Sequence, residues 1–349
     1  MQKRVIGFDL LRSYAIILVI CKHSVILLPK NFDFFFSFLP DPVDIFFVLS
    51  GFLIGNLFIR DFFFENAIHK INFKSIFLFI KKRWFRTLPN YYLFLGINII
   101  LVYFSLIPGS INQFTFTYFI FCQNLFFQFD IFFWESWSLA VEEWFYILFP
   151  IIFLIIHKIK KVNPKVAYLC VCILLIGIAL IYKCFALKMN LNTELFIRKI
   201  ILSRLDTISV GLISAFLFNF YFKYWNSYTK PFFVLGTLSY FSIKHFTINP
   251  MIIYSINSVS IALILPTFMH LKLDTSRAKI VTFLSNTSYS AYLTHLILFN
   301  LILHFFSLNS VFLNVTIFIC YLITTFFLSY LVYKFFQTPI IKYRNKHLS

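Results

Sequence analysis

Long apolar runs, separated by shorter polar stretches, follow one another along the whole chain. About ten of them are long enough to cross the roughly 30 Å hydrocarbon layer of a bilayer as α-helices. The runs lie at about residues 5–28, 43–62, 87–107, 138–157, 165–183, 205–222, 231–247, 250–269, 280–304 and 311–336. This pattern predicts an all-α fold, a polytopic transmembrane helical bundle of about ten spans that forms a single integral-membrane domain over residues 1–349. A Phe-rich segment with polar interruptions, residues 112–133, is expected to be re-entrant or interfacial.

Composition and charge agree with a membrane protein and set its orientation. Hydrophobic residues make up 60% of the chain and charged residues 13%, which excludes an ordinary soluble globular protein. The loops and helix ends on the N-terminal side of the expected spans hold 22 Lys and Arg residues, against 7 on the opposite side. The positive-inside rule therefore predicts that both termini are cytoplasmic. It also explains the net charge of +18, so that no nucleic-acid partner is expected.

The first apolar run is unusual because it contains Asp9, Arg12, Lys22 and His23. One charge at the centre of a transmembrane helix costs roughly 2.5–3.5 kcal/mol, so four ionisable groups need a functional reason. Arg12 and His23 are eleven residues apart, which places them on one helix face about 16 Å apart along the axis. Lys22 points about 100° away from His23 and is expected to reach toward the interface. The shared face of Arg12 and His23 predicts the wall of a site that extends through the membrane.

A basic cluster is expected at the cytoplasmic side. Arg83 and Arg86 are three residues apart and would share a helix face, and Arg12 lies in the inner half of the first span. Arginine binds phosphate groups with two parallel hydrogen bonds, so these three residues predict a phosphate site. The alternative is that the basic run sets topology and contacts anionic membrane lipid.

A second cluster is expected on the outer side, around His23. Imidazole titrates near neutrality, so His23 is a candidate to take a proton from a hydroxyl that attacks an acyl group, with Asp44, Glu142 or Glu143 orienting the ring. The alternative for His23 is a hydrogen bond between helices. His295, deep in the ninth span, is expected either to pack and hydrogen-bond behind the site or to contact substrate.

Three further features have simpler interpretations. Gly51 and Gly55 form a GxxxG spacing that predicts close helix packing, while Ser50 as an acyl-carrying nucleophile is a minor alternative. Arg204 and Asp206 are expected to form a local ion pair. No set of His, Cys, Asp or Glu residues has metal-ligand spacing, so no metal is expected.

Six sequence blocks together resemble the acyltransferase 3 family of integral membrane acyltransferases. In order they are FDLLRSYAIILVICKH, DIFFVLSGFLIG, KKRWFRTLPNYYL, WSLAVEEWFYILFP, SRLDTISVGLISAFL and LSNTSYSAYLTHLIL. The tail, FQTPIIKYR, departs from the family, which often has Glu before its Pro where this chain has Gln337 and Thr338. The resemblance covers nearly the whole chain.

The resemblance implies transfer of an acyl group, commonly acetyl from acetyl coenzyme A, to a hydroxyl of an extracytoplasmic carbohydrate or lipid-linked glycan. Arg12 and His23 match the family's first-span pair, and Glu142 matches the first Glu of its fourth-span block. Arg83 and Arg86 match the paired arginines. The implied protein is a multi-pass O-acetyltransferase of a bacterial-type inner or plasma membrane.

Together, the residues and the resemblance predict separate roles for the arginines and for His23. The arginines Arg12, Arg83 and Arg86 bind the donor, and His23 acts as general base or carries the acyl group transiently. Asp44 and Glu142 are expected to support His23. The competing hypothesis is a transporter or flippase, in which the intramembrane charges form a proton or substrate pathway.

Overall fold

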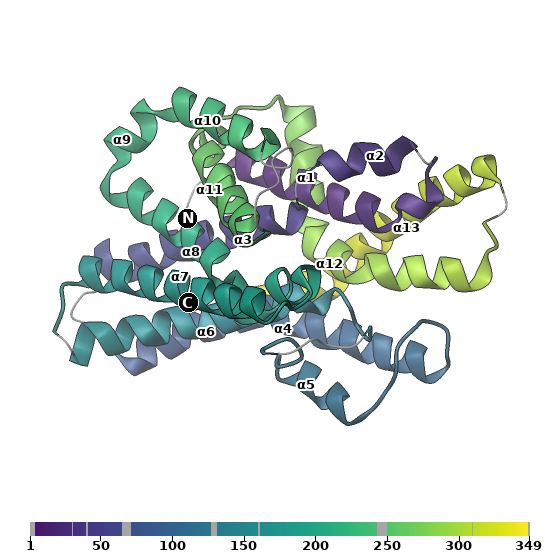
Figure 1. Cartoon of the computed structure of the whole chain (residues 1–349), viewed down its shortest axis with the longest axis horizontal. Coiled ribbons are helices and arrows are strands. Elements are labelled where there is room, and N and C mark those ends of the chain that lie inside the picture. Colours follow the sequence, from purple (N-terminus) through teal and green to yellow (C-terminus); the bar gives the residue numbers. More distant parts are fainter. Residues whose placement is uncertain are drawn as a thin grey trace.

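The chain folds as a bundle of helices (Figure 1). A computed structural model describes residues 4–29, 31–39, 41–64, 71–126, 131–159, 161–242, 250–308 and 310–347, and these contain no strand. The helices are α1 (Ile6–His23), η1 (Val25–Leu27), α2 (Asn31–Phe38), α3 (Pro42–Ile59), η2 (Arg60–Phe64), α4 (Phe73–Tyr103), η4 (Gln113–Thr115), α5 (Phe116–Phe119), α6 (Ser136–Ile159), α7 (Pro164–Lys188), η5 (Thr193–Ile197), α8 (Ile201–Phe220), α9 (Phe222–Ser227), α10 (Thr229–Ser242), α11 (Pro250–Met269), α12 (Thr275–Phe305), α13 (Val311–Val332), η7 (Tyr333–Gln337) and α14 (Thr338–His347). The all-α prediction is confirmed for these residues.

Seven helical stretches in the described ranges are long and apolar enough to cross a membrane. They are Pro42–Phe63, Phe73–Tyr103, Ser136–Lys158, Pro164–Lys188, Ile201–Phe220, Ile252–Met269 and Val311–His347. The other three expected spans fall on α1, α10 and α12, which are helical as expected. Residues 243–247 of the expected span 231–247 lie outside the described residues. The multi-pass architecture is established, whereas the count of ten spans and the side of the termini stay predictions.

Helix α4 is longer than the sequence pattern predicts. The expected span began near residue 87, but the helix starts at Phe73, where Asn72 and Ser75 form a reciprocal capping box. Its 31 residues are about 46 Å long at 1.5 Å per residue, more than the roughly 30 Å hydrocarbon layer. Arg83 and Arg86 therefore lie within a continuous helix and share the face that their spacing predicts.

Helices α3 and α8 pack with their backbones almost in contact. A Cβ atom added to Gly51 would lie 2.0 Å from the carbonyl oxygen of Ile208, and one added to Gly211 would lie 2.2 Å from that of Val48. A Cβ on Gly55 would lie 2.5 Å from the hydroxyl of Tyr168. The prediction that Gly51 and Gly55 serve close helix packing is confirmed.

In its described residues, the segment between α4 and α6 contains η4, the single turn of α5, and turns, and it projects beside α4 (Figure 1). Its backbone carbonyls accept hydrogen bonds from side chains of the bundle. Tyr91 donates to Tyr118 O at 2.8 Å, and Trp144 donates to Phe121 O at 2.9 Å. Non-helical backbone at membrane depth needs such partners. Residues 127–130 of the expected re-entrant or interfacial segment lie outside the described residues.

Candidate active site

A cavity opens between α1, α3, α4, α6 and α12, and it encloses about 860 Å³ of atom-free space including its open mouth. Most of its wall is apolar, from residues such as Phe46, Phe47 and Leu53. The principal polar residues of the wall are Arg12, Ser50, Arg83, Arg86, Glu142, Tyr146, Tyr289 and Tyr292.

Three guanidinium groups line this cavity without a protein partner. In the part of the chain that the structure describes, the side chains of Arg12, Arg83 and Arg86 form no hydrogen bond and no ion pair. The Nε atom of Arg83 is buried, and its guanidinium lies over the ring of Phe79 at 5.8 Å. Buried polar groups are normally hydrogen-bonded, so the unpaired Nε of Arg83, in a cavity that Arg12 and Arg86 also line, indicates a site for an anion.

Glu142 lies in the same cavity as the arginines. Its carboxylate accepts hydrogen bonds from Ser50 Oγ at 2.7 Å and from the hydroxyl of Tyr146 at 2.9 Å. The sequence placed Glu142 in an outer cluster that supports His23, but the structure records no hydrogen bond between these two residues. The reason is helical register, since Tyr146, four residues later on α6, shares the face of Glu142 and directs it toward Ser50 of α3.

His23, at the C-terminal end of α1, is paired with the second histidine that the sequence singled out. Its Nδ1 lies 2.9 Å from Nε2 of His295, and the two rings stack with centroids 5.0 Å apart. His295 is fully buried in α12, and its Nδ1 lies 2.6 Å from the carbonyl oxygen of Tyr292. Of the alternatives for His295, hydrogen bonding behind the candidate base is the one observed. Lys22 points aside and donates to the carbonyl of Leu39 at 2.7 Å.

Tyr292 connects the cavity to the histidine pair. Its side chain lines the cavity wall, and its hydroxyl lies 2.7 Å from Ser138 Oγ and donates to the carbonyl of Glu135 at 3.1 Å. The backbone carbonyl oxygen of Tyr292 accepts the hydrogen bond from Nδ1 of His295. The arginine cavity therefore reaches a residue that is in direct contact with the histidine pair.

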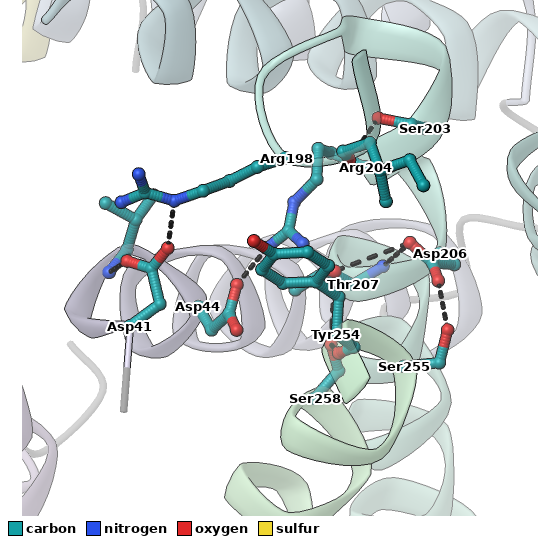
Figure 2. Close-up of polar contacts among 12 residues, drawn as sticks. Asp41, Asp44, Arg198, Ser203, Arg204, Asp206, Thr207, Tyr254, Ser255 and Ser258 are labelled. Atoms are coloured by element: carbon teal, nitrogen blue, oxygen red, sulfur yellow. Dashed lines mark hydrogen bonds and ion pairs between the residues drawn. The ribbon is translucent and has the colours of Figure 1, made fainter. Parts of the chain in front are cut away.

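Asp44 lies in a different polar cluster, where it forms an ion pair with Arg204 (Figure 2). Both side chains are fully buried, and the Arg204 guanidinium also lies over the ring of Tyr254 at 4.8 Å. Two expectations are corrected here. Asp44 does not hydrogen-bond to His23, because the arginine charge from α8 takes its carboxylate. Arg204 and Asp206 are not a local pair either, because residues two apart project from nearly opposite sides of a helix.

Asp206 instead accepts a hydrogen bond from Lys183 Nζ of α7 at 2.5 Å. It accepts another from Ser255 Oγ of α11 at 2.9 Å (Figure 2). Together with the Asp44 pair, this contact ties α3, α7, α8 and α11 to one another through charged side chains. The sequence missed these partners because they lie on other helices, and no spacing within one helix indicates them.

A further group of charges lies beside the N-terminal ends of α3 and α8. Arg198 donates to Asp41 Oδ2 at 2.5 Å (Figure 2). It also pairs with Glu194. Burial disfavours the Asp41 carboxylate, but the charge and hydrogen bond of Arg198 outweigh it and hold the pKa of Asp41 below its usual range. Burial, helped by the charge of Arg198, lowers the pKa of Lys199 to about 8. The ammonium of Lys199 lies 3.8 Å from the ring centre of Trp134.

The fold and the cavity define a class: a multi-pass helical membrane protein with an arginine-lined cavity near a histidine pair. A family model described as an acyltransferase domain matches residues 5–334, nearly the whole chain. The chain therefore belongs to the acyltransferase 3 family, and the resemblance is confirmed. Comparisons with curated proteins and with solved structures found no match.

Proposed function

We propose that the protein transfers an acetyl group from cytoplasmic acetyl coenzyme A to a hydroxyl of an extracytoplasmic carbohydrate, such as a surface polysaccharide or a lipid-linked glycan. The observation that carries the proposal is the set of three guanidinium groups, Arg12, Arg83 and Arg86, around one cavity. The wall of that cavity includes Tyr292, whose carbonyl is hydrogen-bonded to His295. The host membrane is a bacterial-type inner or plasma membrane, with both termini in the cytoplasm.

The arginine cavity suits the anionic end of the donor. Coenzyme A carries phosphate groups, which guanidinium groups bind with paired, charge-assisted hydrogen bonds. The positive-inside orientation places Arg83 and Arg86 toward the cytoplasm, where the donor is available. Glu142 holds the hydroxyls of Ser50 and Tyr146, so these groups leave the arginines free for a ligand.

His23 is the general base of the proposed reaction. It takes the proton of the acceptor hydroxyl as the hydroxyl oxygen attacks the thioester carbonyl. The carbon–sulfur bond then breaks, the proton passes to the leaving thiolate, and the products are an ester and free coenzyme A. The C-terminal end of α1, where His23 lies, favours the positive charge that the imidazole carries between these steps. Apolar walls keep water from the thioester.

Binding of coenzyme A to purified protein in nanodiscs tests the donor site. A hydrogen bond to a charged group contributes about 1.5–3 kcal/mol, so Arg86→Gln should weaken binding roughly 10- to 150-fold by calorimetry. The matched control is Arg60→Gln, because Arg60 is outside the cavity and paired with Asp61 at 2.8 Å. Equal affinities for both variants would show that Arg86 serves topology only.

Acylation of surface glycans tests the reaction. A deletion strain complemented with the wild-type gene should regain an acyl ester, detected by mass spectrometry, together with thiol release from acetyl coenzyme A by the purified protein. His23→Ala should abolish the ester while coenzyme A still binds. Ester formation by that variant contradicts the assignment of His23, and a wild-type protein that consumes no thioester favours a transporter.

A further inference from the structure

We propose that His295 is a positioning residue, which fixes the tautomer of His23 so that Nε2 of His23 is the basic nitrogen. The inference rests on the proposed acyl transfer and adds a second histidine to it. It is carried by two hydrogen-bond distances that form an unbroken chain: His23 Nδ1 to His295 Nε2 at 2.9 Å, and His295 Nδ1 to Tyr292 O at 2.6 Å.

The partners decide where the protons are. A backbone carbonyl oxygen can only accept, so Nδ1 of His295 must carry a proton and donate to Tyr292. The His295 side chain is fully buried, and no carboxylate among the described residues pairs with it, so its ring is neutral. In a neutral ring with a proton on Nδ1, Nε2 is an acceptor. Nδ1 of His23 must therefore donate to it, which leaves the lone pair of His23 on Nε2.

The surroundings of His295 hold this arrangement in place. The hydroxyl of Tyr321, from α13, donates to the carbonyl of His295 at 3.1 Å. The ring stacks on His23 with an angle of 27° between the planes. Since α12 is continuous from Thr275 to Phe305, neither the ring nor its carbonyl partner lies on a loop.

The arrangement parallels the orienting group of a Ser-His-Asp triad, with a neutral imidazole in place of the carboxylate. When His23 takes a proton on Nε2, its Nδ1–H still donates to His295, so the charge that forms is stabilised without a buried anion. The second histidine thus serves catalysis through His23 and does not touch the reacting atoms.

Two amide substitutions at position 295 separate its two hydrogen bonds. The amide of Gln reaches the place of Nε2 and can accept from His23, whereas the amide of Asn reaches the place of Nδ1 and can bond only to Tyr292. We expect His295→Asn and His295→Leu to lower kcat by roughly 10- to 100-fold, with the KM for acetyl coenzyme A unchanged. His295→Gln should retain the larger share of kcat.

The alternatives give different results. A purely structural role predicts that Asn and Gln behave alike and that activity follows thermal stability. An unchanged kcat in both the Asn and Leu variants, or more activity in the Asn than in the Gln variant, overturns the proposal. If wild-type protein consumes no acetyl coenzyme A, the proposed function fails. The tautomer of His23 can then still be measured directly.

That measurement is nitrogen-15 NMR of histidine-labelled wild-type protein in nanodiscs, with the signals of His23 assigned through the His23→Ala variant. It does not depend on the folding of any variant at position 295. We expect the proton of His23 on Nδ1. A proton on Nε2 overturns the inference.

Discussion

Replacement of the buried Asp44 and Arg204 pair separates a structural role of Asp44 from a catalytic one. Both side chains are fully buried, so Asp44→Leu leaves the Arg204 charge without its counter-ion. Removal of one partner from a buried ion pair typically costs about 3–5 kcal/mol, which is roughly a 10²- to 10⁴-fold change in the folding equilibrium. Arg204→Met should cost a similar amount, because it leaves a buried carboxylate.

The double variant Asp44→Leu with Arg204→Met should recover most of this loss. Three polar atoms of the pair, Oδ2 of Asp44 and Nε and Nη1 of Arg204, are buried without a hydrogen bond, so the native pair is only partly satisfied. Apolar residues of similar volume often replace such pairs at little cost. Unfolding titrations of the four proteins in one detergent give the coupling energy directly.

Activity of the double variant then decides the role of Asp44. If Asp44 only neutralises Arg204, the refolded double variant acylates glycan near the wild-type rate. A double variant that is as stable as wild type but inactive refutes this reasoning and returns Asp44 to the catalytic group that the sequence suggested.

Three further changes test the packing and charges around the site. Gly51→Leu should prevent stable folding, because even its Cβ would lie 2.0 Å from the Ile208 carbonyl, and a normal melting temperature would contradict the observed approach of α3 to α8. Asn124→Leu should destabilise the loop by about 1–3 kcal/mol, measured by hydrogen exchange, because the Asn124 amide donates to two buried carbonyls. The lowered pKa of Lys199 means that the unfolded chain binds more protons between about pH 8 and pH 10.5, so stability should rise with pH over that window. Lys199→Met should remove this rise in detergent unfolding curves, and an identical slope in both proteins would show that Lys199 does not titrate there.

Much of the architecture was readable from the sequence because it depends on local pattern. Apolar length predicts the helices, and the three-residue spacing of Arg83 and Arg86 predicts their shared face, which the common cavity confirms. The spacing of Gly51 and Gly55 likewise predicts a close helix contact. Each of these inferences uses only the geometry of a single helix.

Contacts between side chains of different helices could not be predicted from the sequence in the same way. His23 and His295 are 272 residues apart, and no periodicity indicates that their rings meet. Asp44 was assigned to His23 from membrane depth alone, and depth does not say which neighbouring helix faces a side chain. One error was avoidable, since Arg204 and Asp206, two residues apart on a helix, point to different sides of it.

Arg12 and His23 lie on one uninterrupted helix, α1. The number of residues between them is therefore more constrained than the identity of those residues. A substitution at an intervening position leaves both side chains where they are. A single inserted residue would turn His23 by about 100° relative to Arg12 and move it away from His295. Seven inserted residues would restore the direction to within about 20°, but the two side chains would be about 10 Å further apart along the axis. Within this interval the protein should accept many exchanges of one apolar residue for another and no change in their number.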